Sequence, residues 1–478
     1  MKQVLSIAAS EWRYWLRSQL SVSAFALFVL LLVTTSIVTA VRMQTEQQVR
    51  EQQQQLAEQT FLAQPDRHPH RMVHYGHYVY RSTMPLAVFD PGLDPVTGQS
   101  IFLEGHRQNT AMFAHSDAST NLGGLAWLTP ALVYQLFAPL LIILLGHSAI
   151  AREREAKLLI PLLAQGLKPL TIIYGKSLAL LSFASLLLLP LVLSALYSLY
   201  AGEKLLSVVA LIAVYFVYLV LWCLFSILLS VLIIKRSSIL TTLTVVWLTV
   251  ALVLPSMAVT VVSQTSPLPG KIATDLSMLA ELRKLGDGHN ANDPAFARLR
   301  DELLKQYQVD SVEQLPVNFR GLVAKEGEEK LTEVLVRYAE QRMQQELKQA
   351  KTLQQFAWLS PSLAVAFASR AISATDLQHY HQFLRQAEEL RYNFVQGLNS
   401  AHVEKLSYQD DINRNKDKAS WLRARVDASN WQVLDNFRFD AADSPARLRQ
   451  ASYSISIMLS WLAVILCVLF ASSRSLKP

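Results

Sequence analysis

The amino-acid sequence predicts an all-α membrane protein with six transmembrane helices. Hydrophobic residues make up 51% of the 478 positions and charged residues only 17%, which is below the roughly 25% charged residues of soluble domains. A helix needs about 20 predominantly apolar residues to cross a bilayer. Apolar runs of this kind occupy residues 21–41, 128–150, 177–200, 205–234, 239–262 and 453–472.

The positions of Lys and Arg predict how the chain is oriented, because these residues concentrate in short cytoplasmic segments beside the spans. They occur before the first span, between spans two and three, between spans four and five, and after the sixth. Both termini, including the tail 473–478, are therefore expected in the cytoplasm, and residues 42–127 and 263–452 form two large loops on the opposite side. This distribution accounts for much of the net charge of +7, so we expect no nucleic-acid partner.

Residues 1–20 predict a helix that lies along the membrane surface. Val4, Leu5, Ala8, Trp12 and Trp15 recur at helical spacing, with polar and charged residues between them. Tryptophan is common at the depth of the lipid headgroups, and basic side chains reach the adjoining water. A flexible basic tail is the alternative. The regular spacing favours an interfacial helix followed by an uncleaved first span.

The first large loop has two parts. Residues 43–64 are rich in Gln and Glu and contain no Pro or Gly, so they predict a helical extension of the first span. Pro65 is expected to end that helix. Residues 66–127 are rich in Pro, Gly, His and aromatic residues, with a turn signal at residues 90–92. We expect a compact, largely irregular unit there.

The second large loop is predicted to form a helical hairpin or bundle. Helix-start patterns lie at Asp293 and at Thr375, where a Gln three positions later completes a capping box. Residues 356–373 are too short and too interrupted to span a bilayer. They are apolar enough to pack against the outer membrane surface or against a partner. His379 and His381 are expected at the surface, because positions two apart do not share a helix face.

Four histidines, His68, His70, His74 and His77, are the strongest candidates for a chemical site. Closely spaced imidazoles can bind zinc or copper, which would make the chain a membrane-anchored metal-binding protein or metalloenzyme. The alternative is that these rings pack among neighbouring tyrosines and form hydrogen bonds with the backbone. Both cysteines lie inside predicted spans, and no HExxH motif is present. We therefore favour the packing interpretation and expect no cofactor in this chain.

Energy for any transport must come from elsewhere. No nucleotide-binding or hydrolase motif is recognisable in the sequence, so ATP would be bound by another subunit. Ionisable residues are almost absent from the spans, which argues against an ion-coupled pump. Residues 151–176 combine basic charge with an apolar stretch between two spans. An ordinary cytoplasmic loop is the alternative, but the amphipathic composition favours a helix that docks a partner.

The interfacial helix, the six spans and one sequence pattern resemble the membrane subunits of type-2 ABC exporters. The pattern consists of Glu153-Arg154, Leu158-Leu159, Gly166 and Gly175-Lys176. In addition, residues 68–109 and 359–399 resemble a bacterial branch of these permeases that has two enlarged periplasmic loops.

The resemblance implies a permease subunit of the bacterial inner membrane that is not itself an enzyme. It would dimerise with a second copy or with a sister permease, and it would bind a dimer of ABC ATPase subunits. The segment between spans two and three would be the coupling helix, which sits in a cleft of the ATPase. The residues expected in that contact are Glu153, Arg154, Leu158, Leu159, Gly166 and Lys168.

Overall fold

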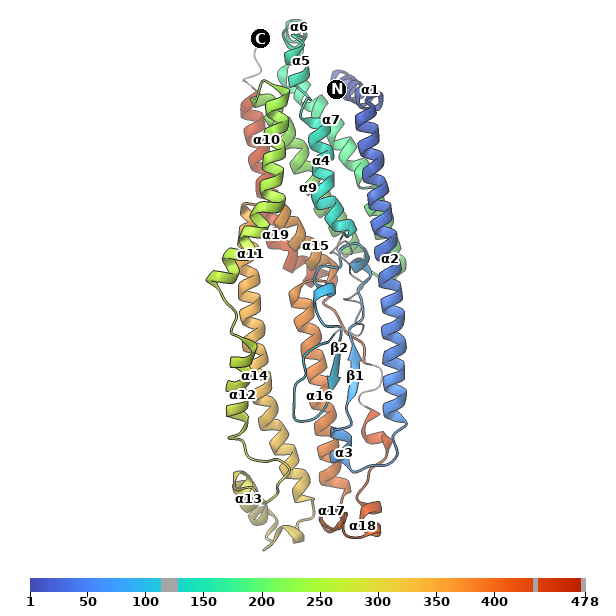
Figure 1. The fold of residues 1–478 in the computed structure, drawn as a ribbon, viewed down its shortest axis with the longest axis vertical. Coiled ribbons are helices and arrows are strands. Elements are labelled where there is room, and N and C mark those ends of the chain that lie inside the picture. Colours follow the sequence, from blue (N-terminus) through green and yellow to red (C-terminus); the bar gives the residue numbers. More distant parts are fainter. Residues whose placement is uncertain (113–127, 433–436, 474–478) are drawn as a thin grey trace.

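The chain forms a long, narrow assembly of helices, with α1 and the last turn of α19 at one end (Figure 1). The computed structural model describes residues 1–112, 128–432 and 437–473. The predicted first loop therefore lies outside the described residues from position 113 onward, and the predicted tail lies outside them from position 474.

The secondary structure is almost entirely helical. The elements of the first half are α1 (Lys2–Arg17), α2 (Gln19–Leu62), α3 (Pro69–Val73), β1 (His77–Tyr80), η1 (Pro85–Val88), η2 (Asp94–Val96), β2 (Ser100–Leu103), α4 (Pro130–Gly146), α5 (Ala151–Glu155), α6 (Leu159–Ala164), α7 (Pro169–Leu187), α8 (Leu189–Tyr200) and α9 (Leu205–Leu232). Those of the second half are α10 (Arg236–Leu248), η5 (Thr249–Val253), α11 (Leu254–Thr265), α12 (Lys271–Leu282), η6 (Pro294–Phe296), α13 (Ala297–Tyr307), η7 (Val312–Gln314), α14 (Phe319–Gln355), η8 (Phe356–Trp358), α15 (Pro361–Ser373), α16 (Leu377–Lys405), α17 (Tyr408–Asn413), α18 (Lys418–Arg423), η9 (Ala428–Asn430) and α19 (Ser444–Ser472).

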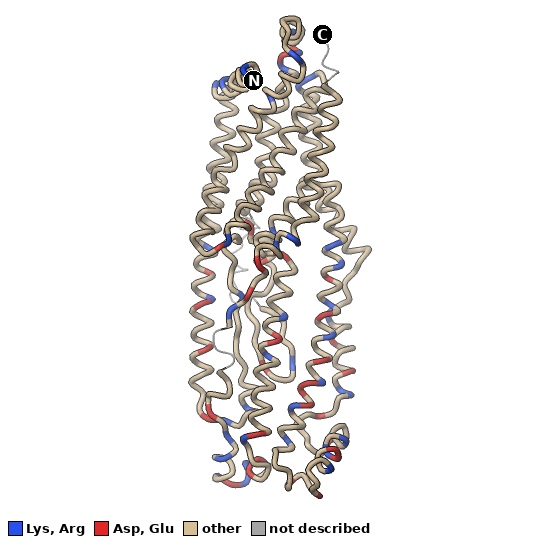
Figure 2. The backbone as a smooth tube through the Cα atoms, turned by 180° about the vertical axis from the view of Figure 1, so that it is seen from behind, with Lys and Arg blue, Asp and Glu red and all other residues tan. Residues whose placement is uncertain are grey.

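Within the described residues, six helical stretches are long and apolar enough to cross a membrane. They are α2, α4 with α5, α7 with α8, α9, α10 with η5 and α11, and α19. Charged side chains are sparse in the half of the molecule where these helices pack together, whereas they are frequent in the opposite half (Figure 2). The prediction of a multi-pass, all-α membrane protein is thus confirmed. The side of the membrane that each loop faces stays a prediction.

Two of the spanning stretches change their helical geometry beside a proline. Pro190 is the second residue of α8, just after the break from α7. Pro255 is the second residue of α11, which follows the five-residue π-helical segment η5. Proline lacks the amide hydrogen that a regular helix uses, and π segments are one way in which a helix accommodates such a disruption. Pro139, by contrast, lies inside the uninterrupted helix α4.

Helix α2 extends well beyond the first predicted span, residues 21–41, as the Gln-rich composition predicts. Its 44 residues correspond to about 66 Å at 1.5 Å per residue. The polar second part docks against β1 and the residue that follows it. The Gln54 side chain accepts a hydrogen bond from the Tyr80 backbone amide at 3.0 Å, and Arg50 donates to the Arg81 carbonyl at 3.2 Å.

The part of the chain away from the spanning helices, residues 45–112, 266–355, 374–432 and 437–440, is called the distal unit below. It contains a two-stranded antiparallel sheet in which His77 of β1 pairs with Leu103 of β2. The prediction of a largely irregular first loop missed this sheet. Val79 and Ile101 from the strands are buried with Phe394 of α16 in a small apolar core. This core joins the two large loops into one unit.

The second loop is confirmed as helical. Its two longest helices, α14 and α16, are connected by α15, which lies among the spanning helices. Helix α14 runs toward the spanning helices, α15 packs among them, and α16 runs back (Figure 1). Ala364, Val365, Ala368 and Ile372 of α15 are completely buried where this helix contacts α9 and α19. Residues 356–373 therefore pack largely within the chain's own helical bundle, whereas the sequence predicted packing against the outer membrane surface or against a partner. Small side chains permit this close helix approach.

Replacing Ala368 by Phe tests the packing of α15. The large ring has no room at a completely buried position, so the free energy of unfolding of the detergent-solubilised chain should fall by about 1–3 kcal/mol. Thermal unfolding followed by circular dichroism measures this loss. The matched control is Ala280→Phe on the exposed surface of α12, which should leave the melting curve nearly unchanged. Equal stability of both variants would contradict the assigned packing.

Candidate functional site

Residues 151–168 form a protrusion at the end of the molecule that also holds α1 (Figure 1). The protrusion consists of the short helices α5 and α6 and the turns beside them. The side chains of Leu158 and Ile160 are 55% and 58% exposed, whereas Leu159 between them is only 6% exposed. Two large apolar side chains thus face outward from its tip.

A cluster of charged side chains, with Glu11 and Lys176 buried and Arg152 and Glu153 partly buried, holds the base of the protrusion. Lys176 of α7 donates to Glu11 of α1 at 2.6 Å and also contacts Glu153 of α5. Arg152 contacts both carboxylates, with 3.0 Å to Glu153. These four residues, called the anchor cluster below, balance two positive charges with two negative ones. They join α1, α5 and α7.

Helix α1 can reach this cluster because Gly175 lies where it crosses α7. A Cβ atom at position 175 would come within 2.6 Å of the Ile7 Cβ atom. A side chain at that position would therefore push the two helices apart. The Gly175-Lys176 pair seen in the sequence thus has a structural role: the first residue permits the close crossing and the second supplies the buried ammonium group.

The other flank of the protrusion is fastened to the end of α9. Arg154 donates to the carbonyl oxygens of Val231 and Ile233 at 3.0 and 2.9 Å, groups that have no partner within the helix at its C-terminal end. Glu155 contacts Arg236 at the start of α10, with 2.5 Å between carboxylate and guanidinium. The protrusion is therefore attached to four of the surrounding helices.

The six residues expected to contact an ATPase divide into two groups. Glu153, Arg154 and Leu159 make contacts within the chain and position the protrusion. Leu158, Gly166 and Lys168 are exposed. Ile160 is equally exposed but was not singled out, because the sequence there is apolar at nearly every position and carries no signal of which side chains face outward. The docking role of all these residues stays a prediction.

Replacing Glu11 by Gln tests the anchor cluster. The change leaves Arg152 and Lys176 with only one carboxylate, and loss of a buried ionic partner is expected to lower the local opening free energy by about 3 kcal/mol. Hydrogen exchange of residues 151–168, followed by mass spectrometry, should accelerate. Glu389→Gln on the exposed face of α16 is the control. Unchanged exchange in the Glu11 variant would show that the cluster does not hold the protrusion.

The four histidines singled out in the sequence do not form one cluster. His77 is buried beside Phe61, with 5.3 Å between ring centroids. His68 joins His402 and Asp411 in one group. The remaining two, His70 and His74, belong to a second group described below.

Asp411 is the centre of the first histidine group. Its carboxylate lies 3.0 Å from His68 Nε2 and 2.9 Å from His402 Nε2, and it also contacts the Arg414 guanidinium. Burial raises the pKa of Asp411, but hydrogen bonds from the two histidines outweigh burial and hold the pKa well below its usual range. Arg414 lies 2.8 Å from His68 Nε2. A positive group thus already occupies the space beside these imidazoles, which disfavours a metal ion there.

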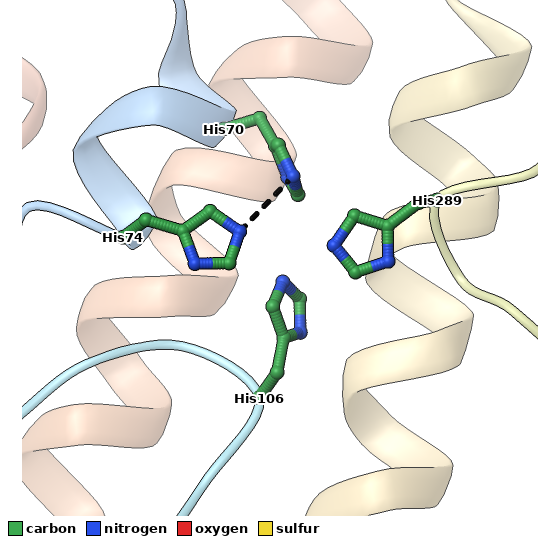
Figure 3. A group of neighbouring side chains, drawn as sticks. All are labelled: His70, His74, His106 and His289. Atoms are coloured by element: carbon green, nitrogen blue, oxygen red, sulfur yellow. Dashed lines mark hydrogen bonds between the residues drawn. The ribbon is translucent and has the colours of Figure 1, made fainter. Parts of the chain in front are cut away.

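The second histidine group brings together His70, His74, His106 and His289 (Figure 3). One ring nitrogen from each residue lies within 4.8 Å of the others. His70 and His74 come from α3 and its C-terminal cap, His106 from the turn after β2, and His289 from the loop between α12 and η6. Burial, with smaller contributions from His289, His106 and His74, lowers the pKa of His70 to about 2. That imidazole is therefore neutral near pH 7 and retains a lone pair.

The sequence interpretation missed His106 and His289 because each is far in sequence from the other members and has no local motif. It was wrong about His379 and His381, which are both buried. His379 lies 2.7 Å from Asp376, and His381 lies 2.6 Å from Glu346 of α14. Helix α16 has partners on more than one side, so residues on different faces are both covered.

Comparison with known protein families matches residues 272–440 to a domain of unknown function, DUF3526. The match includes His289, Glu328 and Asp411, whereas His70 and His106 lie before it. It covers less than half of the chain. No curated protein matches the chain at a significant level.

Replacing Asp411 by Asn tests the first histidine group. Loss of the negative charge leaves Arg414 and the two buried imidazoles without a carboxylate partner, which should lower the free energy of unfolding by about 3 kcal/mol. Asp410→Asn is the neighbouring control, because Asp410 pairs with the exposed Arg423 and such surface pairs contribute about 1 kcal/mol or less. Thermal unfolding of both variants should separate them. Equal melting temperatures would rule out the central role of Asp411.

Proposed function

We propose that this chain is the membrane subunit of an ATP-driven transporter of the exporter class. The observation that carries the proposal is the exposed apolar pair Leu158 and Ile160 on a protrusion that is fastened at its base. Exposed apolar groups held in a fixed position are suited to protein contacts. The partner would be a separate ATPase subunit, since this sequence contains no recognisable nucleotide-binding motif. The resemblance to type-2 ABC exporters supports the same assignment.

The contacts of the protrusion suggest how an ATPase would act on the membrane part. Movement of the tip would reach α1 and α7 through the anchor cluster, because Lys176 and Arg152 both contact Glu11. It would reach α9 and α10 through Arg154 and Glu155. A push on one small surface would thus be distributed over several spanning helices. Rigid-body motion of packed helices is a common way to convert such local contacts into a larger rearrangement.

The same proposal assigns a membrane and an orientation. The protrusion and both termini would lie in the cytoplasm of a bacterium, and the distal unit would lie in the periplasm beyond the inner membrane. The concentration of Lys and Arg around the protrusion supports this orientation. A second copy or a sister permease would complete the membrane assembly, and the distal unit would receive or gate the cargo.

Replacing both Leu158 and Ile160 by Asp tests this function. The chain would be co-expressed with a separate ABC ATPase subunit from the same genome, and the purified complex assayed for bound ATPase and for ATP turnover in lipid nanodiscs. In the double variant, we expect the amount of bound ATPase and the rate of ATP turnover each to fall at least tenfold, because two charges would be placed in an apolar contact. The matched control is Leu422→Asp in the distal unit, a side chain with a similar exposure of 53%. It should bind and turn over ATP like the unmodified chain.

A photo-crosslinker at position 160 gives an independent measurement. It should attach to the ATPase subunit, whereas one at position 422 should not. Retained ATPase binding and turnover in the Asp variant, with no crosslink from position 160, would contradict the docking role of the protrusion.

A further inference from the structure

We propose that His70, His74, His106 and His289 bind one zinc ion, or another late first-row divalent metal, and that this ion ties the loop before η6 to α3. The four imidazoles come from three separate segments of the chain and converge on one point (Figure 3). Imidazole nitrogen is a preferred ligand of zinc, copper and nickel, whereas calcium and magnesium prefer oxygen. The site does not depend on the transport function proposed above.

The spacing of the ring nitrogens suits a tetrahedral ion. Zinc–nitrogen distances of about 2.0–2.1 Å place two ligand nitrogens of a tetrahedral site about 3.4 Å apart. The Nε2 atoms of His70 and His74 are 3.2 Å apart. The complete set lies within 4.8 Å. His74 and His289 are exposed, so their rings have room for the small movement that would complete the tetrahedron.

Two of the imidazoles are already oriented by carboxylates. His106 Nδ1 lies 3.0 Å from Glu328, and His289 Nδ1 lies 3.0 Å from Asp287. A carboxylate on one ring nitrogen directs the other nitrogen toward a metal and increases its basicity. The Nε2 atom of His106 is buried and has no hydrogen-bond partner among the described residues. This nitrogen is therefore available to bind a metal ion.

Glu328 is itself held in place by a buried arginine. Arg391 donates to Glu328 at 2.6 Å and also to Glu388. The carboxylate behind His106 is thus fixed by a buried charge network between α14 and α16.

The backbone around His106 explains how this residue reaches the two histidines of α3. Its φ of 64° lies in the left-handed region, which is uncommon for residues other than glycine and often occurs at functional sites. The preceding Gly105 lets this turn approach α3, because a Cβ atom there would lie only 2.0 Å from a Val73 methyl carbon. This close approach brings His106 to the two histidines of α3.

The two histidine groups differ in a way that favours metal only at this one. Beside His68, the Arg414 guanidinium supplies the positive charge that Asp411 requires. In the four-histidine group, the ring hydrogen bonds and ion pairs that the structure describes are made with another imidazole or with a carboxylate. In the first group, the two Nε2 atoms that face Asp411 already have protein partners, whereas the second group presents four ring nitrogens to a common point.

Zinc titration of the full-length chain in detergent tests the proposal. The chain, purified with a histidine-free tag and stripped with a chelator, should bind one zinc ion per chain in isothermal titration calorimetry. Substitution of cobalt should give the visible absorption of a tetrahedral site. His74→Ala and His289→Ala should each weaken zinc binding at least 100-fold. Both positions are exposed, so these variants are expected to fold. His147→Gln, at the end of α4, is the control and should bind like the unmodified chain.

Two further measurements distinguish a preorganised metal site from histidines that bind metal independently of one another. Asp287→Asn keeps all four ligands but removes the carboxylate behind His289, and should weaken zinc binding by about 10–100-fold. Zinc should also slow hydrogen exchange in residues 283–293 of the unmodified chain, but not in His74→Ala. Binding of less than one ion per chain, or unchanged affinity in both alanine variants, would overturn the proposal.

Discussion

The packing of α15 against the spanning helices α9 and α19 is the contact on which the rest of the structure depends. Helix α15 is joined to α14 through η8 and to α16 through a short turn at Ala374, so its position determines where both long helices begin. The first loop is tied to the same place, because Asp90 contacts Ser369 and its carbonyl accepts a hydrogen bond from Thr375 at 3.0 Å. Burial of small side chains makes this junction close and rigid.

The junction also links the two candidate sites, which lie toward opposite ends of the molecule. Helix α9 contacts α15, and the carbonyls at its C-terminal end accept hydrogen bonds from Arg154 in the protrusion. Helices α14 and α16 continue from α15 into the distal unit, where Glu328 and Arg391 support His106. A continuous set of packed helices therefore connects the protrusion with the four-histidine group. Packed helices of this kind can carry energetic coupling between distant sites.

The two histidine groups show how the same side chain acquires different chemistry from its surroundings. A buried carboxylate with an arginine beside it contacts the Nε2 atoms of both His68 and His402. Carboxylates placed on the outer nitrogens of His106 and His289 leave the inner nitrogens available. The two groups differ in which ring nitrogen contacts the carboxylate, and in whether an arginine lies beside the imidazoles. The spacing of histidines along the sequence specifies neither property.

The sequence by itself determined the six apolar helices, the helical extension of α2 and the helical character of the second loop, because hydropathy and helix propensity are local properties of consecutive residues. It also placed the protrusion between the correct pair of spans. Only the tertiary structure decided that residues 356–373 pack inside the bundle, that Leu158 and Ile160 face outward while Leu159 faces inward, and that His70 and His74 meet His106 and His289. These outcomes depend on contacts between residues far apart in the chain, which no local pattern specifies.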